Sequence, residues 1–230
     1  MKKLLNVKDI WHFSIDWGIF MRRFMKERQI DRLYHFTQAD NLKTIFKYGL
    51  LPRDELESRG IESSINDEWR FDGCCNAVCT SIEFPNYKMF YKLRCDNPDV
   101  DWAVLELNAE IICDSQCAFN WTNAGDSKSY NIPLNRRMTQ AAFEDLFADR
   151  DGYPTRDELN IPDWYPTNPQ AEVLVFDQIP ISYINKVSFE RREIFLKYKE
   201  IVPPNIPANV DVGLFRWRKD YESWKGRVEE

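Results

Sequence analysis

The chain has 230 residues, of which 43% are hydrophobic and 14% aromatic. Its 31 Lys and Arg residues against 37 Asp and Glu residues give a net charge of −6, which excludes a polybasic mode of nucleic-acid binding. This composition is typical of a folded globular protein, because it supplies enough apolar surface for a core. Only two histidines are present, so a site built from several imidazoles is excluded.

The sequence lacks signals for export or membrane insertion. The opening residues MKKLLNVKDIWHF contain an interrupting Asp9 and no small-residue cleavage site, and no uncharged apolar stretch reaches spanning length. We therefore expect a cytoplasmic protein with no membrane contact. The six cysteines include no C-x2-C pair, so they are interpreted as free thiols among strands, with a zinc site as the alternative. We expect no bound metal.

The first two predicted elements are helices. Residues 9–28 carry apolar side chains at steps of three and four, the period of an amphipathic helix that packs on the core. A second helix follows over residues 42–48, with Asp40 or Asn41 as its N-cap. Gly49 suits the left-handed residue after its last turn.

The rest of the chain mixes strands, helices and irregular segments. Residues 50–76 are predicted as a short helix and a long loop, and residues 149–169, rich in Asp, Asn and Pro, as an ordered surface excursion. Apolar runs predict strands over 77–84, 102–113, 171–176 and 186–189. A charged helix over about 190–200 and an aromatic, basic tail complete the chain. No βαβ rhythm is present, which favours an α+β fold.

Three segments carry candidate ligand-binding groups. His35 and Thr37 lie just before the second helix, at a strand-to-helix turn that suits ligand contact, although His35 could equally be a satisfied core or surface histidine. Gln170 and Glu172 share one face at the start of a strand, and the alternative is a strand-end carboxylate in solvent. Residues 79–89 place hydroxyls and an aromatic ring where a planar amide and a ribose would fit.

Taken together, these segments resemble the ADP-ribosyltransferase family, and most closely the DarT group of nucleic-acid-modifying toxins. The resemblance is carried by LYHFTQADNLKTIFKYGLL (33–51), DSQCAFNWTNAG (114–125) and QAEVLVFDQIPISYI (170–184). It implies an α+β fold in which split mixed or antiparallel β-sheets surround an NAD+ cleft with flanking helices. A single domain spanning 1–230 is expected, with a core at about 30–190, the N-terminal helix 9–28 and a C-terminal helical extension at 190–230.

The resemblance also implies an activity and its residues. Family members transfer ADP-ribose from the co-substrate NAD+ to a base of single-stranded DNA, and a CmdT-like group modifies messenger RNA. Glu172 matches the catalytic carboxylate, Arg70 matches an arginine of the loop that covers NAD+, and Gln170 matches a position that orients the acceptor. The residues that match the NAD+-binding segments are His35, Phe36, Thr37, Asn41, Gly49, Leu50, Ser81, Phe84, Tyr87 and Met89. Of these, Tyr87 and Met89 match the end of the strand that flanks nicotinamide.

Contacts with the nucleic acid are expected on the acceptor side of the cleft. The candidates are Trp121, Asn123, Arg136 and Arg137. Aromatic rings here could stack on unpaired bases, or instead be buried anchors, and the arginines could be solvated helix faces. Two departures from the family pattern, the short stretch after Arg70 and Gln116 in place of a histidine, leave the modified base and the choice of DNA or RNA open.

Three functional hypotheses follow. The leading one is a mono-ADP-ribosyltransferase that acts as the toxin of a toxin–antitoxin or phage-defence system, with an antitoxin protein as partner. A protein-directed ADP-ribosyltransferase is the alternative within the same enzyme class. The third is a non-catalytic interaction module of the same fold that binds a partner through its tail.

Overall fold

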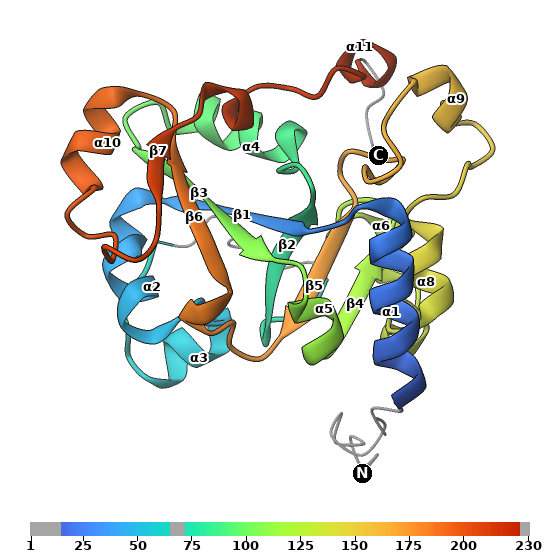
Figure 1. Ribbon diagram of the computed structural model, residues 1–230, viewed down its shortest axis with the longest axis horizontal. Coiled ribbons are helices and arrows are strands. Elements are labelled where there is room, and N and C mark those ends of the chain that lie inside the picture. Colours follow the sequence, from blue (N-terminus) through green and yellow to red (C-terminus); the bar gives the residue numbers. More distant parts are fainter. Residues whose placement is uncertain (1–14, 65–71, 226–230) are drawn as a thin grey trace.

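The computed structural model describes residues 15–64 and 72–225, which form a seven-stranded sheet surrounded by helices (Figure 1). The strands are β1 Arg32–Gln38, β2 Ala77–Ile82, β3 Trp102–Asn108, β4 Cys117–Asn120, β5 Glu172–Phe176, β6 Ile184–Phe189 and β7 Ala208–Val210. The α-helices are α1 Ile15–Arg28, α2 Leu42–Tyr48, α3 Arg53–Ser58, α4 Tyr87–Asp96, α5 Ile111–Asp114, α6 Ser127–Tyr130, α7 Leu134–Arg137, α8 Gln140–Asp145, α9 Arg156–Leu159, α10 Arg192–Tyr198 and α11 Tyr221–Trp224. Single 3-10 turns are η2 Ala39–Asn41, η3 Ile181–Tyr183 and η4 Val212–Phe215.

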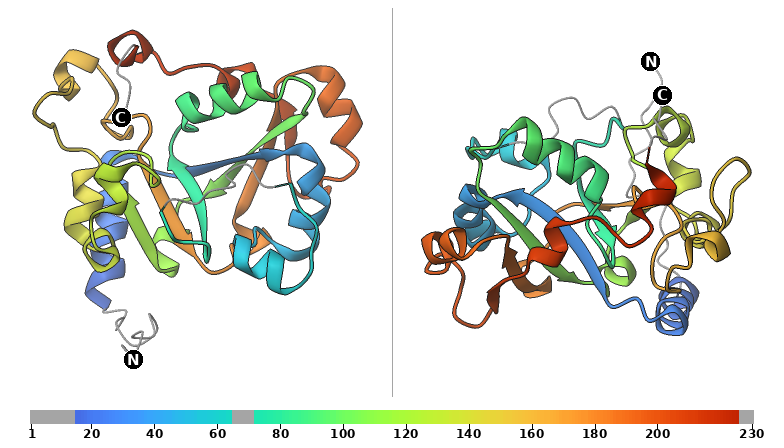
Figure 2. Two further views of the ribbon diagram at one scale, coloured as in Figure 1. Left: turned by 180° about the vertical axis from the view of Figure 1, so that it is seen from behind. Right: turned by 90° about the horizontal axis from the view of Figure 1, so that it is seen from above.

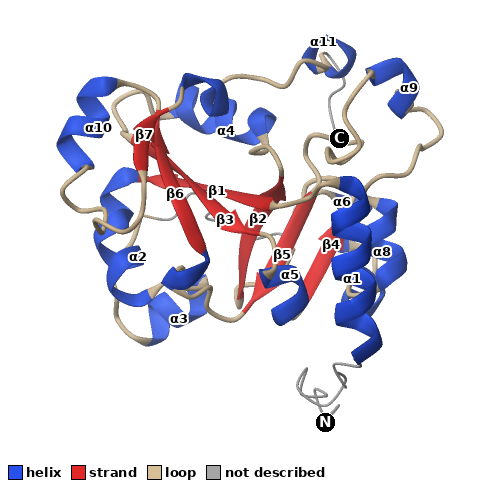
Figure 3. Cartoon of the chain, viewed as in Figure 1, coloured by secondary structure: helices blue, strands red, loops and turns tan. Residues whose placement is uncertain are grey.

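The sheet consists of two halves that meet at a narrow seam. Its strand order is β4-β5-β2-β1-β3-β6-β7, and every named pairing is antiparallel except that of β6 with β7. At the seam, β1 and β2 pair only through Leu33 with Ile82 and Tyr34 with Ser81. Figure 3 shows the strands diverging on either side of this point. The expected α+β fold with a split sheet is confirmed.

A buried carboxylate reinforces the seam. Glu83 follows β2 with a φ of 58°, a left-handed conformation that is uncommon for a residue with a side chain. Its side chain accepts hydrogen bonds from the backbone N–H groups of Asp31 and Arg32, at 2.6 and 2.8 Å, and pairs with the Arg32 guanidinium. The carboxylate therefore fixes the end of β2 against the start of β1.

Helices cover both flanks of the sheet (Figure 2). The N-terminal helix α1 packs beside α5 and inserts Phe24 against Phe143 of α8, with 5.2 Å between ring centroids. Phe143 in turn contacts Phe119 of β4 at 4.8 Å. This packing confirms the predicted amphipathic helix from Ile15 onward, and its expected start at residue 9 lies outside the described residues.

Several boundaries differ from the sequence prediction. The strand expected over 102–113 ends at Asn108, whose side chain accepts from the Glu110 N–H and turns the chain into α5. The four-residue strand β4 and the strand β7 inside the expected helical extension were not predicted. Neither Asp40 nor Asn41 caps α2 with its side chain, because Asp40 accepts from the Tyr198 hydroxyl and Asn41 bonds elsewhere.

The irregular segment that leads into β5 is held by arginine side chains. Between residues 149 and 169 the chain is irregular, as predicted, except for the short helix α9, which was not predicted. Three guanidinium groups donate to carbonyls of this segment: Arg28 to Asp163, Arg156 to Pro162 and Tyr165, and Arg218 to Pro166 and Thr167, at 2.7–3.3 Å. These bonds replace a backbone ladder in positioning the residues before Glu172.

Arg218 belongs to a buried ion pair in the C-terminal tail. Its guanidinium bonds the carboxylate of Asp220, and both side chains are almost fully enclosed. Asp220 also accepts from the indole N–H of Trp224 at 3.1 Å. The tail is thus fastened to the segment before β5 by charged hydrogen bonds, each of which typically contributes about 1.5–3 kcal/mol.

The described residues contain no membrane-spanning helix, no metal-binding cluster and no disulfide. Within residues 15–64 and 72–225, no helix has the length and apolar character needed to cross a membrane. In the same ranges, no three His, Cys, Asp or Glu side chains gather as a metal site would require. All six cysteines lie in the described part of the chain, and none of them forms a disulfide there.

Gly49 offers a test of the turn that follows α2. Its φ of 84° and ψ of 179° lie in a region adopted almost only by glycine, and an added Cβ would lie 2.6 Å from the Ile179 carbonyl oxygen. Gly49→Ala is expected to lower the free energy of unfolding by about 2–4 kcal/mol, measured by urea denaturation. Gly60→Ala is the control, since Gly60 also has positive φ but no atom within 4 Å of its added Cβ. It should lose only about 1 kcal/mol, and equal losses would contradict the steric explanation.

Candidate active site

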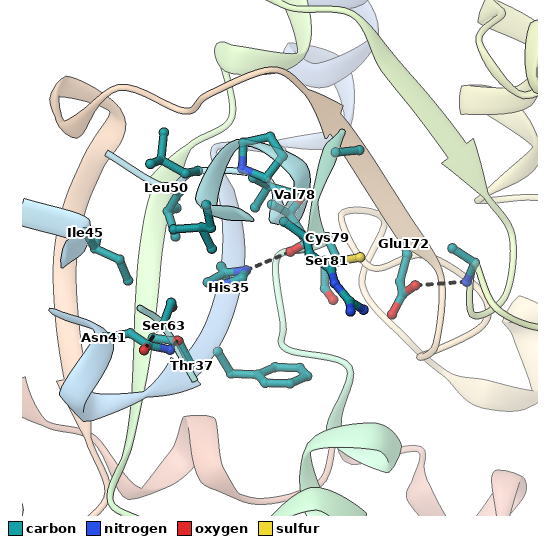
Figure 4. Close-up of a pocket in the computed structure, with 18 of the residues that line it drawn as sticks. His35, Thr37, Asn41, Ile45, Leu50, Ser63, Val78, Cys79, Ser81 and Glu172 are labelled. Carbon is teal, nitrogen blue, oxygen red and sulfur yellow. Dashed lines mark hydrogen bonds between the residues drawn. The ribbon is translucent and has the colours of Figure 1, made fainter. Parts of the chain in front are cut away.

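A pocket opens between the two halves of the sheet, beside the seam (Figure 4). Its walls come from β1, β2, the start of β5, α2, the turn after α2 and residues 123–125. Ten of the residues predicted from the sequence line it: His35, Phe36, Thr37, Asn41, Gly49, Leu50, Ser81, Met89, Asn123 and Glu172. The fold therefore brings segments that are far apart in the chain into one site.

Glu172, the first residue of β5, supplies a buried carboxylate to this pocket. Its residue is 5% exposed. Oε1 accepts from the side-chain amides of Asn86 and Asn123, at 3.2 and 3.1 Å, and Oε2 accepts from the backbone N–H of Ala124 at 2.9 Å. Three donors from two other segments fix the carboxylate in place. A charge held in a desolvated site interacts strongly with a nearby developing charge.

Asn86 couples this carboxylate to the start of α4. The residue is fully buried, its Oδ1 accepts from the Met89 N–H at the first turn of α4, and its Nδ2 donates to Glu172. One amide group thus serves as helix N-cap and as donor to the carboxylate. The sequence analysis did not select Asn86. A Pro-Asn pair before a helical run is a capping signal, but that signal does not reveal a partner 86 residues away.

His35 lies on the other side of the pocket, in β1. Its Nδ1 is 2.8 Å from the carbonyl oxygen of Cys79, which only accepts hydrogen bonds, so Nδ1 carries the proton. Burial lowers the pKa of His35 below its usual value, and the bond to Cys79 opposes this only in part. The imidazole is therefore neutral at physiological pH. Figure 4 shows His35 facing the pocket across from Glu172.

Asn41 lines the pocket and also forms hydrogen bonds that hold its neighbours in place. Its amide donates to Thr37 Oγ1 at 2.9 Å and to the Ser64 carbonyl, and its oxygen accepts from Ser63 and from the Ser64 N–H. These bonds hold residues 63–64 against β1. Thr37 and Asn41 were both predicted to bind NAD+, and the structure places them together at one end of the pocket (Figure 4).

Two predicted NAD+-binding residues lie outside the pocket lining. Phe84 packs edge-on against Tyr87 and Tyr165, and Tyr87 is buried against Tyr221. Burial raises the pKa of the Tyr87 hydroxyl well above its usual value. The expectation that Tyr87 and Met89 end a strand was wrong, because Asn86 caps a helix there and both residues belong to its first turn.

The predicted acceptor-side residues are distributed differently. Asn123 lines the pocket, whereas Trp121 lies outside it, with the Arg150 guanidinium 4.1 Å from its ring centroid. Arg136 is exposed. Arg137 is 4% exposed and donates to Asn120 Oδ1 at 2.9 Å, so its guanidinium does not face solvent.

Gln170 and Arg70 complete the set of predicted residues. Gln170 is buried in the turn before β5, where its N–H donates to Asn168, and it is not part of the pocket lining. Arg70 lies outside the described residues. The structure therefore brings together the predicted glutamate and histidine, while the role of Arg70 stays a prediction.

The sequence matches one family model, that of "ssDNA thymidine ADP-ribosyltransferase, DarT", over residues 34–213. The chain belongs to the DarT family. The match covers the pocket, β5 with Glu172, and β1 from Tyr34 onward with His35. The DarT fold and the assignment as an NAD+-dependent ADP-ribosyltransferase, expected from the sequence, are confirmed. Among curated proteins, none is similar enough to this sequence to count as a match.

Solved structures support the same fold at low sequence identity. Thermus sp. 2.9 DarT in complex with carba-NAD+ is 14% identical, with a TM-score of 0.52 over 80% of this chain and 97% of that chain. The same protein in complex with ADP-ribosylated ssDNA is 15% identical, with a TM-score of 0.50 over 82% and 97%. Thermosipho africanus DarTG in complex with ADP-ribose is 20% identical, with a TM-score of 0.56. The match covers 80% of this chain but only 50% of the DarTG chain.

The neutral state of His35 gives a testable pH dependence. Because the folded-state pKa is lowered, protonation below pH 6.5 favours the unfolded chain, so His35 lowers stability as the pH falls and contributes no slope above that value. The free energy of unfolding in urea, measured between pH 5 and 8, should rise with pH toward 6.5 less steeply in His35→Gln than in the unsubstituted protein. Identical slopes would contradict a buried neutral imidazole.

Proposed function

We propose that this chain transfers ADP-ribose from NAD+ to thymidine in single-stranded DNA, with Glu172 as the catalytic carboxylate. The observation that carries the proposal is the buried Glu172 side chain, held by three donors in the pocket that also contains His35. Membership of the DarT family supports the reaction and the acceptor.

The chemistry explains why a fixed carboxylate is needed. The bond between nicotinamide and the ribose C1′ breaks, the electron pair leaves with nicotinamide, and positive charge develops on the ribose as in glycoside hydrolysis. We propose that Glu172 accepts a hydrogen bond from the ribose 2′-hydroxyl and stabilises this charge. The thymidine base then forms the new bond to C1′ and loses a proton to solvent.

The opposite wall of the pocket would hold the rest of NAD+. His35 and Thr37 of β1 and Ser81 of β2 present polar groups there, while Leu50 and Phe36 offer apolar surface. This mixture of a few polar groups on an apolar wall is typical of cofactor sites. We propose that these five residues, with Asn41, Gly49 and Met89, contact NAD+, and that Phe84 and Tyr87 support the wall from behind.

The remaining predicted residues have supporting roles in the proposal. Arg70 would stabilise phosphate or the acceptor electrostatically, because its guanidinium stays protonated and cannot accept a proton from the base. Asn123 would contact the acceptor as well as Glu172, and Arg136 and Trp121 would contact the DNA strand. Gln170 and Arg137 would position the acceptor side, since Gln170 immediately precedes β5 and Arg137 bonds Asn120 of β4.

The biological setting is a further part of the proposal. We infer that the protein acts in the cytoplasm as the toxin of a toxin–antitoxin or phage-defence pair and is inhibited by an antitoxin protein. This inference is supported by membership of the DarT family and is an analogy with that family.

Mass spectrometry of the nucleosides released after reaction with mixed DNA and RNA identifies the acceptor. Modified thymidine is expected, and modified ribonucleosides alone, or label on polypeptide, would overturn the DNA assignment.

Glu172→Gln tests the catalytic assignment. The substitution keeps the shape of the side chain but removes the negative charge, so transfer of label from NAD+ to single-stranded DNA should fall by at least roughly 100-fold. Binding of NAD+ should persist, and the thermal stabilisation that NAD+ produces measures it. Glu144→Gln, at an exposed position of α8, is the matched control and should keep full activity. Unchanged labelling in Glu172→Gln would exclude Glu172 from the reaction.

Asn86→Asp tests the hydrogen bond to the carboxylate. A second carboxyl group at this place repels Glu172, so the pKa of the pair rises and one proton is shared between them. Transfer activity should then be low at acidic pH and recover as the pH rises, whereas the unsubstituted protein should show no such step. Asn97→Asp adds the same charge at the exposed end of α4 and should leave the pH profile unchanged. A uniform loss at all pH values would point to a folding role for Asn86 alone.

A further inference from the structure

The C-terminal tail runs along α4 (Figures 1 and 2), and each of the two carries an exposed aromatic side chain. Trp217 and Tyr91 are 56% and 57% exposed, the two highest values among the large aromatic side chains of the described residues. The rings of Trp217 and Tyr221 are stacked, with 5.1 Å between centroids. We call Tyr91, Trp217 and Tyr221 the tail platform.

The platform is rigidly supported from below. Tyr221 packs edge-on against the buried Tyr87 of α4, with centroids 6.1 Å apart. The Arg94 guanidinium donates to the Phe215 carbonyl at 2.6 Å, and Phe215 packs against Phe90. The tail segment that carries the rings is therefore tied to α4 on one side, and through Arg218 to the segment before β5 on the other.

Basic residues lie close to Trp217 and Tyr221 in the sequence, and one of them contacts a ring. Arg216 and Lys219 flank Trp217 in the sequence, both are exposed, and neither forms an ion pair with any described residue. Lys225 lies 6.0 Å from the centroid of the Tyr221 ring and also pairs with Glu222. In a chain of net charge −6, this gathering of cations beside open aromatic faces is a local feature. Such a combination of cations and aromatic rings suits a ligand that carries both negative charges and planar groups.

The platform and the active-site pocket both use residues of α4. Met89 lines the pocket and contacts Asn123, with 3.6 Å between Sδ and Nδ2. Tyr91 follows two residues later in the same helix, about 3 Å further along its axis but on the opposite face, because helical residues two apart do not share a face. A strand whose reacting base lies beside Glu172 therefore has to cross α4 to reach the platform. Trp217 and Tyr221 lie beyond residues 34–213, the part that matches the family model.

We propose that the tail platform binds nucleotides flanking the modified base, with unpaired bases stacked on Trp217 and Tyr91 and phosphates bound by Arg216 and Lys219. The inference rests on the proposed function for its acceptor strand. Sequence-tolerant stacking on aromatic side chains beside a basic track is the general way in which proteins hold single strands. A protein partner is disfavoured because the exposed residues beside Trp217, Arg216 and Lys219, are charged, and interface cores are depleted of charged residues.

Binding of a fluorescent single strand of about twelve nucleotides, measured by anisotropy without NAD+, tests the platform directly. Trp217→Ala should weaken binding roughly tenfold, Tyr91→Ala less, and neither should change thermal stabilisation by NAD+. Leu196→Ala, at a similarly exposed apolar position on α10, should bind as the unsubstituted protein does. A strand of about three nucleotides should bind Trp217→Ala and the unsubstituted protein equally, because it does not reach the platform.

The salt dependence separates phosphate contact from a structural effect. Lys219→Gln should reduce the slope of log K against log salt concentration by about 0.7, the value for one phosphate of a single strand. Lys199→Gln, on an exposed residue after α10, should leave the slope unchanged.

The outcomes distinguish the two proposals. Full labelling of single-stranded DNA with unchanged affinity and salt slope in the platform variants would overturn the platform alone. Platform-dependent binding without any labelling would overturn the proposed function alone. If light scattering shows a dimer that Trp217→Ala dissociates while strand affinity stays the same, the surface binds a second copy of the chain and the platform is overturned.

Discussion

The position of the Glu172 carboxylate depends on guanidinium groups that hold a segment with little regular structure. Residues 162–167 precede β5, and their carbonyls accept from arginines of α1, α9 and the tail. A backbone ladder fixes its own strands, whereas this segment is fixed by side chains from the neighbouring α9 and from two distant parts of the chain, α1 and the tail. Each guanidinium offers several donors in a rigid plane, which lets one residue satisfy two carbonyls at once. Glu172 begins β5 where that framework ends.

The pocket then joins two halves of a sheet that hardly pair with one another. His35 belongs to one half and Glu172 to the other, and the seam between them contains two residue pairs. Asn86 and Glu83, both on the connection that follows β2, compensate for this weak pairing: one bonds Glu172 and the other bonds the start of β1. A short stretch of chain after one strand therefore sets the distance between the two walls of the cleft.

The sequence predicted the parts of the fold that depend on local patterns. The helical period located α1 from Ile15, the glycine after α2 marked its end, and the order of His35, Asn123 and Glu172 indicated the family and the pocket. It did not reveal β4, whose four residues are too short for a periodic signal, or β7, which gains its strand character only by pairing with β6. Asn86 and Arg218 were missed for the same physical reason, because their partners are distant in sequence. The extent of the domain over 1–230 and the role of Arg70 stay predictions.

The buried Arg218–Asp220 pair changes where a minimal catalytic fragment can be cut. A boundary drawn at residue 213, where the family model ends, would remove Arg218 and with it the donors to the Pro166 and Thr167 carbonyls. It would also strip Trp224 from the hollow that it shares with Trp121 and Asn168. A truncated protein of this kind would lose order in the residues just before β5, although the cut is far from Glu172 in the chain. The C-terminal tail is thus part of the scaffold that positions the start of β5 in the pocket wall.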